Sequence, residues 1–355
     1  MNNTMSNQTN TRIVNHKSLR VMTGVIAILM PFVVQLLSGY KWELSSISVS
    51  YWTHAGDIFV GSIVAIAFFL AAYNGTGDCQ KDTEYWISKL AGLLALMVAL
   101  IPTDCTIYCK NGEVPFWVNN LTFGHHGLVH NIVAVLFFIC LFILINFFAR
   151  TAKYKEKIGR SRFYTIISLC MLFGMPLTYL LALGFGFEPI YWVEVVGLIL
   201  FGIAWFVAGT YKTDERKEPS SSAQHLGDYK VNASIPNYPT KIIVEPGKRY
   251  LFKAHGCWKD AFLACGPTGW GPSWNWWTRK NRLKGSPIFM LCGNIGRNTV
   301  LDDIAFEIGY DKVWTAPKNL EVLSPDNQEL YLFANDWNNK YQNNSGSVNV
   351  SIYKL

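Results

Sequence analysis

The stretch LVHNIVAVLFFICLFILINFF, Leu128 to Phe148, decides the class of protein to which this chain belongs. It contains no Asp, Glu, Lys or Arg. About 20 such residues, each rising about 1.5 Å in an α-helix, cross a hydrocarbon core about 30 Å thick. The stretch therefore predicts a membrane-spanning helix.

Other apolar runs of this kind occur before residue 212. They cover Val21–Leu37, Ile58–Tyr73, Ile87–Ile101, Phe163–Leu183 and Tyr191–Tyr211. Two are short or interrupted, since one begins just after Asp57 and another contains Lys89 and ends at Pro102. Charged residues make up 15% of the chain, against roughly 25% in soluble domains. This succession of apolar runs predicts an all-α bundle of six transmembrane helices between residues 21 and 211. It argues against the alternative, in which the runs are buried helices of a soluble protein. The first run is too long for a signal peptide, and no small-residue cleavage site follows it.

Basic residues in the connections predict the orientation in the membrane. They gather in the N-terminal tail (1–20), after the fourth run and after the sixth, at Arg12, Lys17, Arg20, Arg150, Lys153, Lys155, Lys157, Arg160, Arg162, Lys212, Arg216 and Lys217. The connections on the opposite side carry only Lys41 and Lys110. We expect both termini in the cytoplasm of a multi-pass protein of the inner or plasma membrane. The net charge of +7 then reflects topology, and no nucleic-acid partner is expected, because basic and aromatic residues are not interleaved.

The composition changes after the last apolar run. Residues 212–228 are charged and then Ser-rich, which is typical of a flexible linker. From 229 to 355, short strand-like runs alternate with Pro and Gly turns, at Lys241–Val244, Arg249–Ala254, Ile288–Cys292, Leu330–Ala334 and Val348–Tyr353. This spacing predicts an all-β, jelly-roll-like β-sandwich, so the chain is multi-domain.

A run of short oxygen-bearing side chains lies near the end of this second domain. It is NDWNNKYQNNSGS, residues 335–347, between two strand-like runs. Asp and Asn supply the hard oxygen ligands that Ca²⁺ prefers, and a tight turn adds backbone carbonyls. The run therefore predicts a cation-binding loop.

Several motifs together resemble the galactose-binding, calcium-dependent bacterial lectins of the PA-I type. They are VEPGK at 244–248, HGCW at 255–258, GPTGWGP at 266–272, the stretch 287–294, and the Asn335-Asp336 pair followed by NNSGS at 343–347. The likeness covers nearly all of 229–355, and the terminal loop is its most specific element.

The resemblance implies a calcium site and a sugar site that share residues. Asp336, Asn343 and Asn344 would bind calcium through their side chains, and Lys340 and Asp260 through backbone carbonyls. The sugar would coordinate the metal through two hydroxyls and hydrogen-bond to Asp336 and Asn343, with Trp337 as a further contact.

The chain departs from the lectin pattern in one loop. These lectins grip the sugar with a His and a Gln, whereas residues 273–284 here have neither. They offer instead Trp274, Trp276, Trp277, Arg279, Lys280 and Arg282. Aromatic faces stack on sugars, so Trp274 and Trp276 are candidate ligand contacts. The basic residues suit a phosphate of a nucleotide sugar or an anionic lipid headgroup, and a rigid loop that closes the sandwich is the alternative.

The membrane half has polar residues of its own near the ends of its helices. They are His54, Asp57, Asp104, His126, His130 and Glu194, all expected toward the outer face. His126 and His130 are four residues apart and share a helix face, a spacing suited to Zn²⁺ or proton transfer. With Asp57 they are candidate catalytic residues of a metal-dependent hydrolase, with a faint likeness to ceramidase-like hydrolases. Interfacial histidines and helix-capping acids are the alternative. Segments around Asp57 and Pro102 resemble uncharacterised bacterial six-helix membrane proteins.

The cysteines agree with this arrangement. Cys105 and Cys109 lie in an outer connection, where a local disulfide is expected. Cys257, Cys265 and Cys292 fall in the domain assigned to the cytoplasm, so they are expected to be reduced, and no CxxC pair indicates structural zinc.

Three functions are compatible with the sequence. The first is a membrane sensor or receptor with a lectin-like, calcium-dependent domain that binds a carbohydrate. The second is a membrane-embedded metal-dependent hydrolase, and the third is a ligand-gated effector or channel. We expect membrane lipid and a sugar-containing ligand as partners, and a homo-oligomer.

Overall fold

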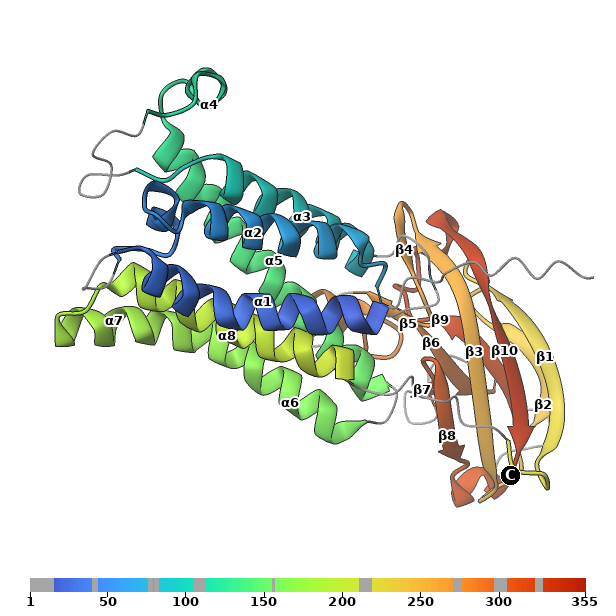
Figure 1. Ribbon diagram of the computed structural model, residues 1–355. Helices are drawn as coiled ribbons and strands as arrows, with labels where there is room; N and C mark the ends of the chain where they lie inside the picture. The colour runs from blue at the N-terminus through green and yellow to red at the C-terminus, as the bar shows by residue number, and fades with distance from the viewer. Residues whose placement is uncertain are drawn as a thin grey trace, which may run out of the picture.

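A computed structural model describes residues 16–39, 44–75, 79, 83–104, 113–154, 157–210, 219–270, 276–296, 305–322 and 328–355. A helical region is followed by an antiparallel β region, as predicted, and Figure 1 shows the β region at one end of the helices. The sequence-based division into two fold classes is confirmed.

The helical region contains long apolar helices. Its elements are α1 (His16–Leu37), η1 (Ser48–Trp52), α2 (Gly56–Ala72), α3 (Thr83–Leu100), α4 (Phe116–Leu121), α5 (His126–Tyr154), α6 (Ile158–Leu169), η2 (Cys170–Gly174), α7 (Met175–Phe185) and α8 (Pro189–Thr210). Among the described residues, 5 helices are long and apolar enough to cross a membrane, with 158–185 counting as one. The helix α2 has 17 residues and is shorter than these. It is short because the preceding residues form η1.

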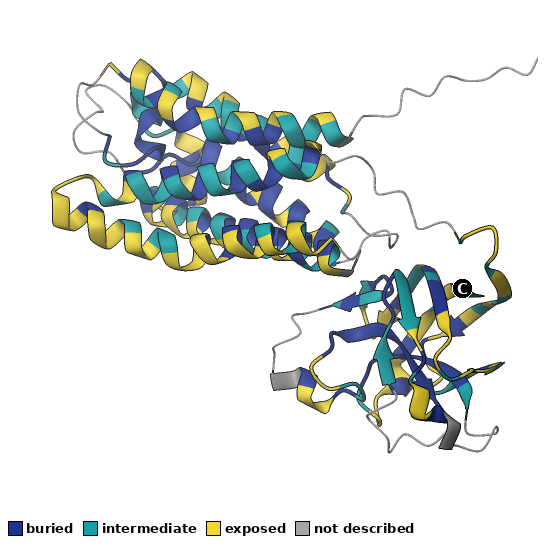
Figure 2. Cartoon of the chain, turned by 90° about the horizontal axis from the view of Figure 1, so that it is seen from below, coloured by how far each residue is buried: buried dark blue, intermediate teal, exposed yellow. Residues whose placement is uncertain are grey.

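Helices α1 and α8 pack with their backbones close together. A Cβ added at Gly24 would lie 2.6 Å from the carbonyl oxygen of Gly202 and from the amide nitrogen of Phe206. Small residues permit this approach between helices in lipid, where burial of apolar surface gives little driving force. Many large apolar side chains point outward, as the exposed stripes on the helices in Figure 2 show, and Leu36 and Phe68 are examples. A bundle with this surface fits a lipid environment.

The end of the bundle away from the β region is closed by η1. The carboxylate of Glu194 in α8 accepts a hydrogen bond from the Ile47 backbone N–H at 2.5 Å. The indole N–H of Trp52 donates to the carbonyl oxygen of Thr103 at 2.9 Å. Glu194 therefore serves as an internal cap for η1, which explains an acidic residue in an apolar helix.

Two antiparallel sheets form the β region. The first has the order β1 (Gln224–Asn232), β10 (Asn344–Lys354), β3 (Arg249–Asp260), β4 (Leu263–Cys265), with β8 (Asp311–Thr315) also paired to β3. The second has the order β2 (Tyr238–Ile243), β9 (Glu329–Ala334), β6 (Ile288–Ile295), β5 (Thr268–Trp270), with β7 (Ala305–Glu307) paired to β6. Strand β1 starts inside the segment predicted to be a linker, because the pairing of Gln224 with Lys354 is invisible to local composition.

The two sheets enclose one apolar core. Trp258, Tyr250, Phe252 and Phe289 are among its fully buried side chains. The indole N–H of Trp258 donates to the carbonyl oxygen of Phe289 at 3.0 Å, so its polar atom is satisfied inside the core. This core supports the edge of the sandwich where β3 ends and β10 begins.

Covalent and polar contacts join the sandwich to the helices. Cys79, in the connection between α2 and α3, forms a disulfide with Cys257 of β3. The guanidinium of Arg150 in α5 donates to the carbonyl oxygen of Thr268 in β5. The prediction that Cys257 is reduced is wrong, because the fold brings it to Cys79 across 178 residues of chain. Cys265 and Cys292 are buried thiols, and the predicted Cys105–Cys109 pair lies outside the described residues.

Candidate functional site

Asn335 holds the loop that follows β9. Its side-chain amide donates to the carbonyl oxygens of Leu283 at 3.0 Å and Pro287 at 3.1 Å, and its oxygen accepts from the Leu283 N–H at 2.8 Å. The side chain is fully buried. The Asn335 side chain thus links the end of β9 to the segment before β6, and it fixes the position of the next residue, Asp336.

Four polar side chains converge where β3 ends and β10 begins. Asp260 and Asn344 are direct partners in the β3–β10 register, and such partners have Cβ atoms about 5 Å apart. The amide of Asn344 donates to Asp336 Oδ2 at 2.9 Å, and the amide of Asn343 donates to Asp260 Oδ1 at 2.9 Å. The Trp337 backbone N–H donates to Asp336 Oδ1 at 2.7 Å. The residues that the resemblance assigns to one site therefore lie together.

The electrostatics of this group favour a cation. Burial raises the pKa of Asp336, and burial together with the negative charge of Asp336 raises the pKa of Asp260. Both shifts indicate that neighbouring protein groups do not fully offset the cost of burying the ionised carboxylates. Lys340 lies near enough for its positive charge to lower the pKa of Asp336 in part.

The oxygens of the group fit a hard divalent ion. Asn344 is only 7% exposed, and its Oδ1 has no hydrogen-bond partner among the described residues. A buried amide oxygen without a partner, next to an under-compensated carboxylate, matches the donor set of calcium. Asp336, Asp260, Asn343 and Asn344 would hold the ion. Asp260 was predicted to contribute a carbonyl, whereas its carboxylate also lies in the group.

A pocket of about 650 Å³ opens over these side chains. Its lining comprises Asp260, Trp270, Ile288, Asp336, Trp337, Asn339, Lys340, Gln342 and Asn343. The Lys280 ammonium lies 4.8 Å from the centre of the Trp337 ring. The pocket thus combines acidic oxygens with two indole rings and a basic rim, a combination that suits a polyhydroxylated ligand with an apolar face.

Trp270 is a pocket residue that the sequence interpretation did not single out. It ends β5, and the preceding Gly269 has φ +67° and lies against the β6 backbone, where a Cβ would be 2.1 Å from the carbonyl oxygen of Ile288. Only glycine permits this approach, and it sets the position of Trp270. Of the predicted tryptophans, Trp274 lies outside the described residues, and Trp276 begins the short helix η3 (Trp276–Lys280).

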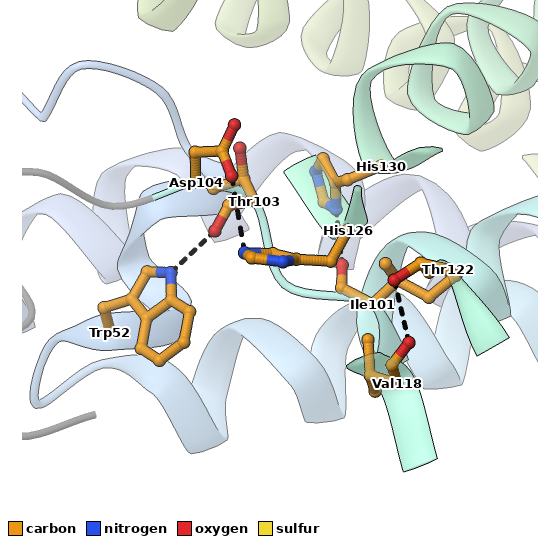
Figure 3. Close-up of polar contacts among 8 residues, drawn as sticks. All are labelled: Trp52, Ile101, Thr103, Asp104, Val118, Thr122, His126 and His130. Atoms are coloured by element: carbon orange, nitrogen blue, oxygen red, sulfur yellow. Dashed lines mark hydrogen bonds and ion pairs between the residues drawn. The ribbon is translucent and has the colours of Figure 1, made fainter. Parts of the chain in front are cut away.

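The predicted histidine pair lies at the opposite end of the molecule from this pocket. His126 Nε2 is 3.3 Å from Asp104 Oδ1, and His130 Nδ1 donates to the carbonyl oxygen of Ile101 at 2.6 Å (Figure 3). His130 is 2% exposed. Among the described residues, His126 Nδ1 and His130 Nε2 are buried and have no hydrogen-bond partner.

Asp57 is not joined to these histidines by any contact among the described residues. It is exposed in the first turn of α2, and Asp104 supplies the carboxylate instead. No group of three or more His, Cys, Asp or Glu suited to a metal ion occurs in the part of the chain that the structure describes. The role of His126, His130 and Asp57 in catalysis stays a prediction.

Comparisons with known proteins complete this description. No protein-family model matches the chain, and no curated protein does. Among solved structures, the EclA N-terminal domain, a PllA-like lectin, is similar at 21% sequence identity. The match covers 37% of this chain and 98% of that chain, with a TM-score of 0.26.

Proposed function

We propose that this chain is a membrane-bound sensor or receptor whose jelly-roll-like, lectin-type sandwich binds a carbohydrate through calcium. Six helical segments would cross the membrane, with α2 as the shortest and α6 to α7 as one crossing. An even number of crossings keeps both termini on the basic side, which the positive-inside rule assigns to the cytoplasm.

One observation carries the proposal. Asp260, Asp336 and the buried, unpartnered oxygen of Asn344 converge below a pocket that also holds Trp270 and Trp337. Calcium bound there would supply a Lewis-acidic centre for two sugar hydroxyls. The chain itself would orient the sugar by hydrogen bonds at Asp336 and Asn343 and by contact with an indole face.

The test is thermal unfolding of the purified full chain, with calcium or with a chelator. Calcium at about 100-fold above its Kd is expected to stabilise by about 2.7 kcal/mol. The Asp336→Asn variant is expected to lose this increment, whereas Asp228→Asn, at an exposed position on β1, is expected to keep it. A sugar panel added in the presence of calcium then identifies the ligand. The same midpoint with calcium and with chelator would refute the metal-dependent site.

A second function is supported by the two buried, unpartnered imidazole nitrogens of His126 and His130. A Zn²⁺ ion held there would activate a bound water molecule, which is the chemistry that a metal-dependent hydrolase needs. Elemental analysis of the purified full chain is expected to find zinc that is lost in His126→Ala. A zinc content equal in both proteins, or absent from both, would leave the lectin-type function alone.

A further inference from the structure

The surface of the membrane can be located next to the sandwich. Trp86, in the first turn of α3, is 59% exposed. Exposed tryptophans at helix ends mark the headgroup level of a bilayer, and basic residues lie beyond it. Arg150 and Lys153 in the last turns of α5 are such residues. The start of α3 and the end of α5 therefore define the membrane boundary on the sandwich side.

The strands that carry the pocket are fixed at this boundary. The disulfide at Cys257 is three residues before Asp260, a distance of roughly 10 Å along a strand. The Arg150 contact at Thr268 is two residues before Trp270, roughly 7 Å along a strand. Both pocket residues are thus held within a short distance of the helix ends.

A second, small cavity lies between the sandwich and the helices. It has a volume of about 30 Å³ and is lined on one side by Thr83, Glu84, Phe147, Arg150 and Thr151, and on the other by residues of 264–270 and Tyr310. Trp270 lines both this cavity and the ligand pocket. One residue, Trp270, is therefore shared by the ligand pocket and the cavity at the helix ends.

An exposed aromatic residue lies next to Asp260, in the hairpin whose second strand contacts α3. Phe262 is 85% exposed at the tip of the β3–β4 hairpin, two residues after Asp260. Ala261 in this tip has φ +50°, which turns the chain sharply. Strand β4 approaches α3, and Ala264 lines the small cavity. In Figure 1, the β4 end of the sandwich lies next to the start of α3, and Figure 2 shows the sandwich to one side of the bundle.

From this placement we propose that the ligand of the pocket is the sugar headgroup of a lipid in the protein's own membrane. Phe262 would enter the headgroup layer, and the pocket would receive a headgroup that projects from the adjacent leaflet. The inference rests on the proposed carbohydrate function and adds the source of the sugar. A soluble glycan presents the same hydroxyl chemistry, so the experiment compares the two sources.

The full chain is placed in nanodiscs of phosphatidylcholine that contain galactosylceramide, glucosylceramide or unglycosylated ceramide, each with calcium. Free methyl galactoside and methyl glucoside are added to a further set of ceramide nanodiscs. Thermal unfolding of the sandwich is measured for wild type, Phe262→Ser and Asp336→Asn. We expect a higher midpoint with one of the glycosylated lipids than with ceramide. The half-maximal effect should require at least tenfold less sugar than with the free glycoside, because the lipid is confined beside the site.

The two variants separate the possible outcomes. Phe262→Ser is expected to weaken the response to the glycolipid and to leave any response to free glycoside unchanged, whereas Asp336→Asn removes both. Equal responses to free and lipid-linked sugar, unaffected by Phe262→Ser, would overturn the lipid source and leave the carbohydrate function standing. No response to any sugar, in a protein that calcium stabilises, would overturn both.

Discussion

At the scale of single residues, the site is defined by the proximity of Asp260 and Asp336. Each carboxylate accepts one hydrogen bond from an Asn side chain. Burial raises the pKa of both, and the charge of Asp336 raises that of Asp260 further. Without a bound cation this arrangement costs folding free energy, and a cation bound there would offset the cost.

This energetic cost predicts that the substitution Asp260→Asn stabilises the calcium-free protein and weakens its stabilisation by calcium. Asp260→Asn keeps an oxygen that accepts from Asn343 and removes a negative charge. We expect it to raise the unfolding midpoint in chelator at pH 7 by a few degrees, equivalent to about 1 kcal/mol. The same variant should lose most of the calcium increment. Calorimetry in both conditions checks this, and a lower midpoint in chelator would contradict it.

The pH dependence follows from the same raised pKa values. A carboxyl whose folded pKa exceeds its unfolded value of about 3.9 binds its proton more tightly when folded. Metal-free stability contributed by Asp260 and Asp336 therefore falls as pH rises between the unfolded and folded values. Calcium needs the ionised forms, so its stabilising increment should be largest above the folded pKa values and should vanish as pH falls through them. Unfolding midpoints from pH 8 to pH 4, with calcium and with chelator, test this. An increment independent of pH would show that the ion binds elsewhere.

At the scale of elements, helices α1 and α8 depend on glycine for their contact. Gly24→Ala would place its Cβ 2.6 Å from backbone atoms of α8, so the helices must separate. Overpacking of this kind costs about 1–3 kcal/mol. Gly61→Ala in α2 is the matched control, because no heavy atom lies within 4 Å of its added Cβ. Thermal unfolding in detergent should distinguish the variants, and equal midpoints would argue against close α1–α8 packing.

Elements formed by local sequence were predictable, whereas their pairing was not. The starts of β3 at Arg249 and β6 at Ile288 follow from β-branched and aromatic runs after Pro and Gly turns. Strand β1 lacks such a run and forms because β10 offers it a partner. The oxygen-rich loop was likewise evident, but the contribution of Trp270 depends on the close approach of Gly269 to β6.

The membrane site illustrates the same limit. The spacing of His126 and His130 follows from helix periodicity, but the choice of their acidic neighbour depends on how α3 and α5 pack. Among the described contacts, Asp104 after α3 meets His126, whereas Asp57 stays exposed in α2. The sequence shows which residues lie at each helix end, but it does not show how the helices are ordered around the bundle.

At the scale of the whole molecule, orientation is the most informative property to measure. Lys17, Arg150, Lys157 and Arg160 all lie in helix ends or connections on the sandwich side. We expect a reporter fused after Leu355 to behave as cytoplasmic, and a reporter inserted at Gly186, between α7 and α8, as external. The reverse pattern would place the sandwich outside the cell and overturn the positive-inside assignment.

Because of the Cys79–Cys257 bond, a break in the backbone between the helices and the sandwich would not separate the two regions. Thr210 and Pro219 flank the only stretch of backbone that connects the helices to the sandwich. If a protease site is inserted there and cut, the two halves should migrate as one species on a gel without reductant and as two species with it. Disulfides persist in oxidising compartments, so a single species without reductant would also count against the assignment of the sandwich to the cytoplasm.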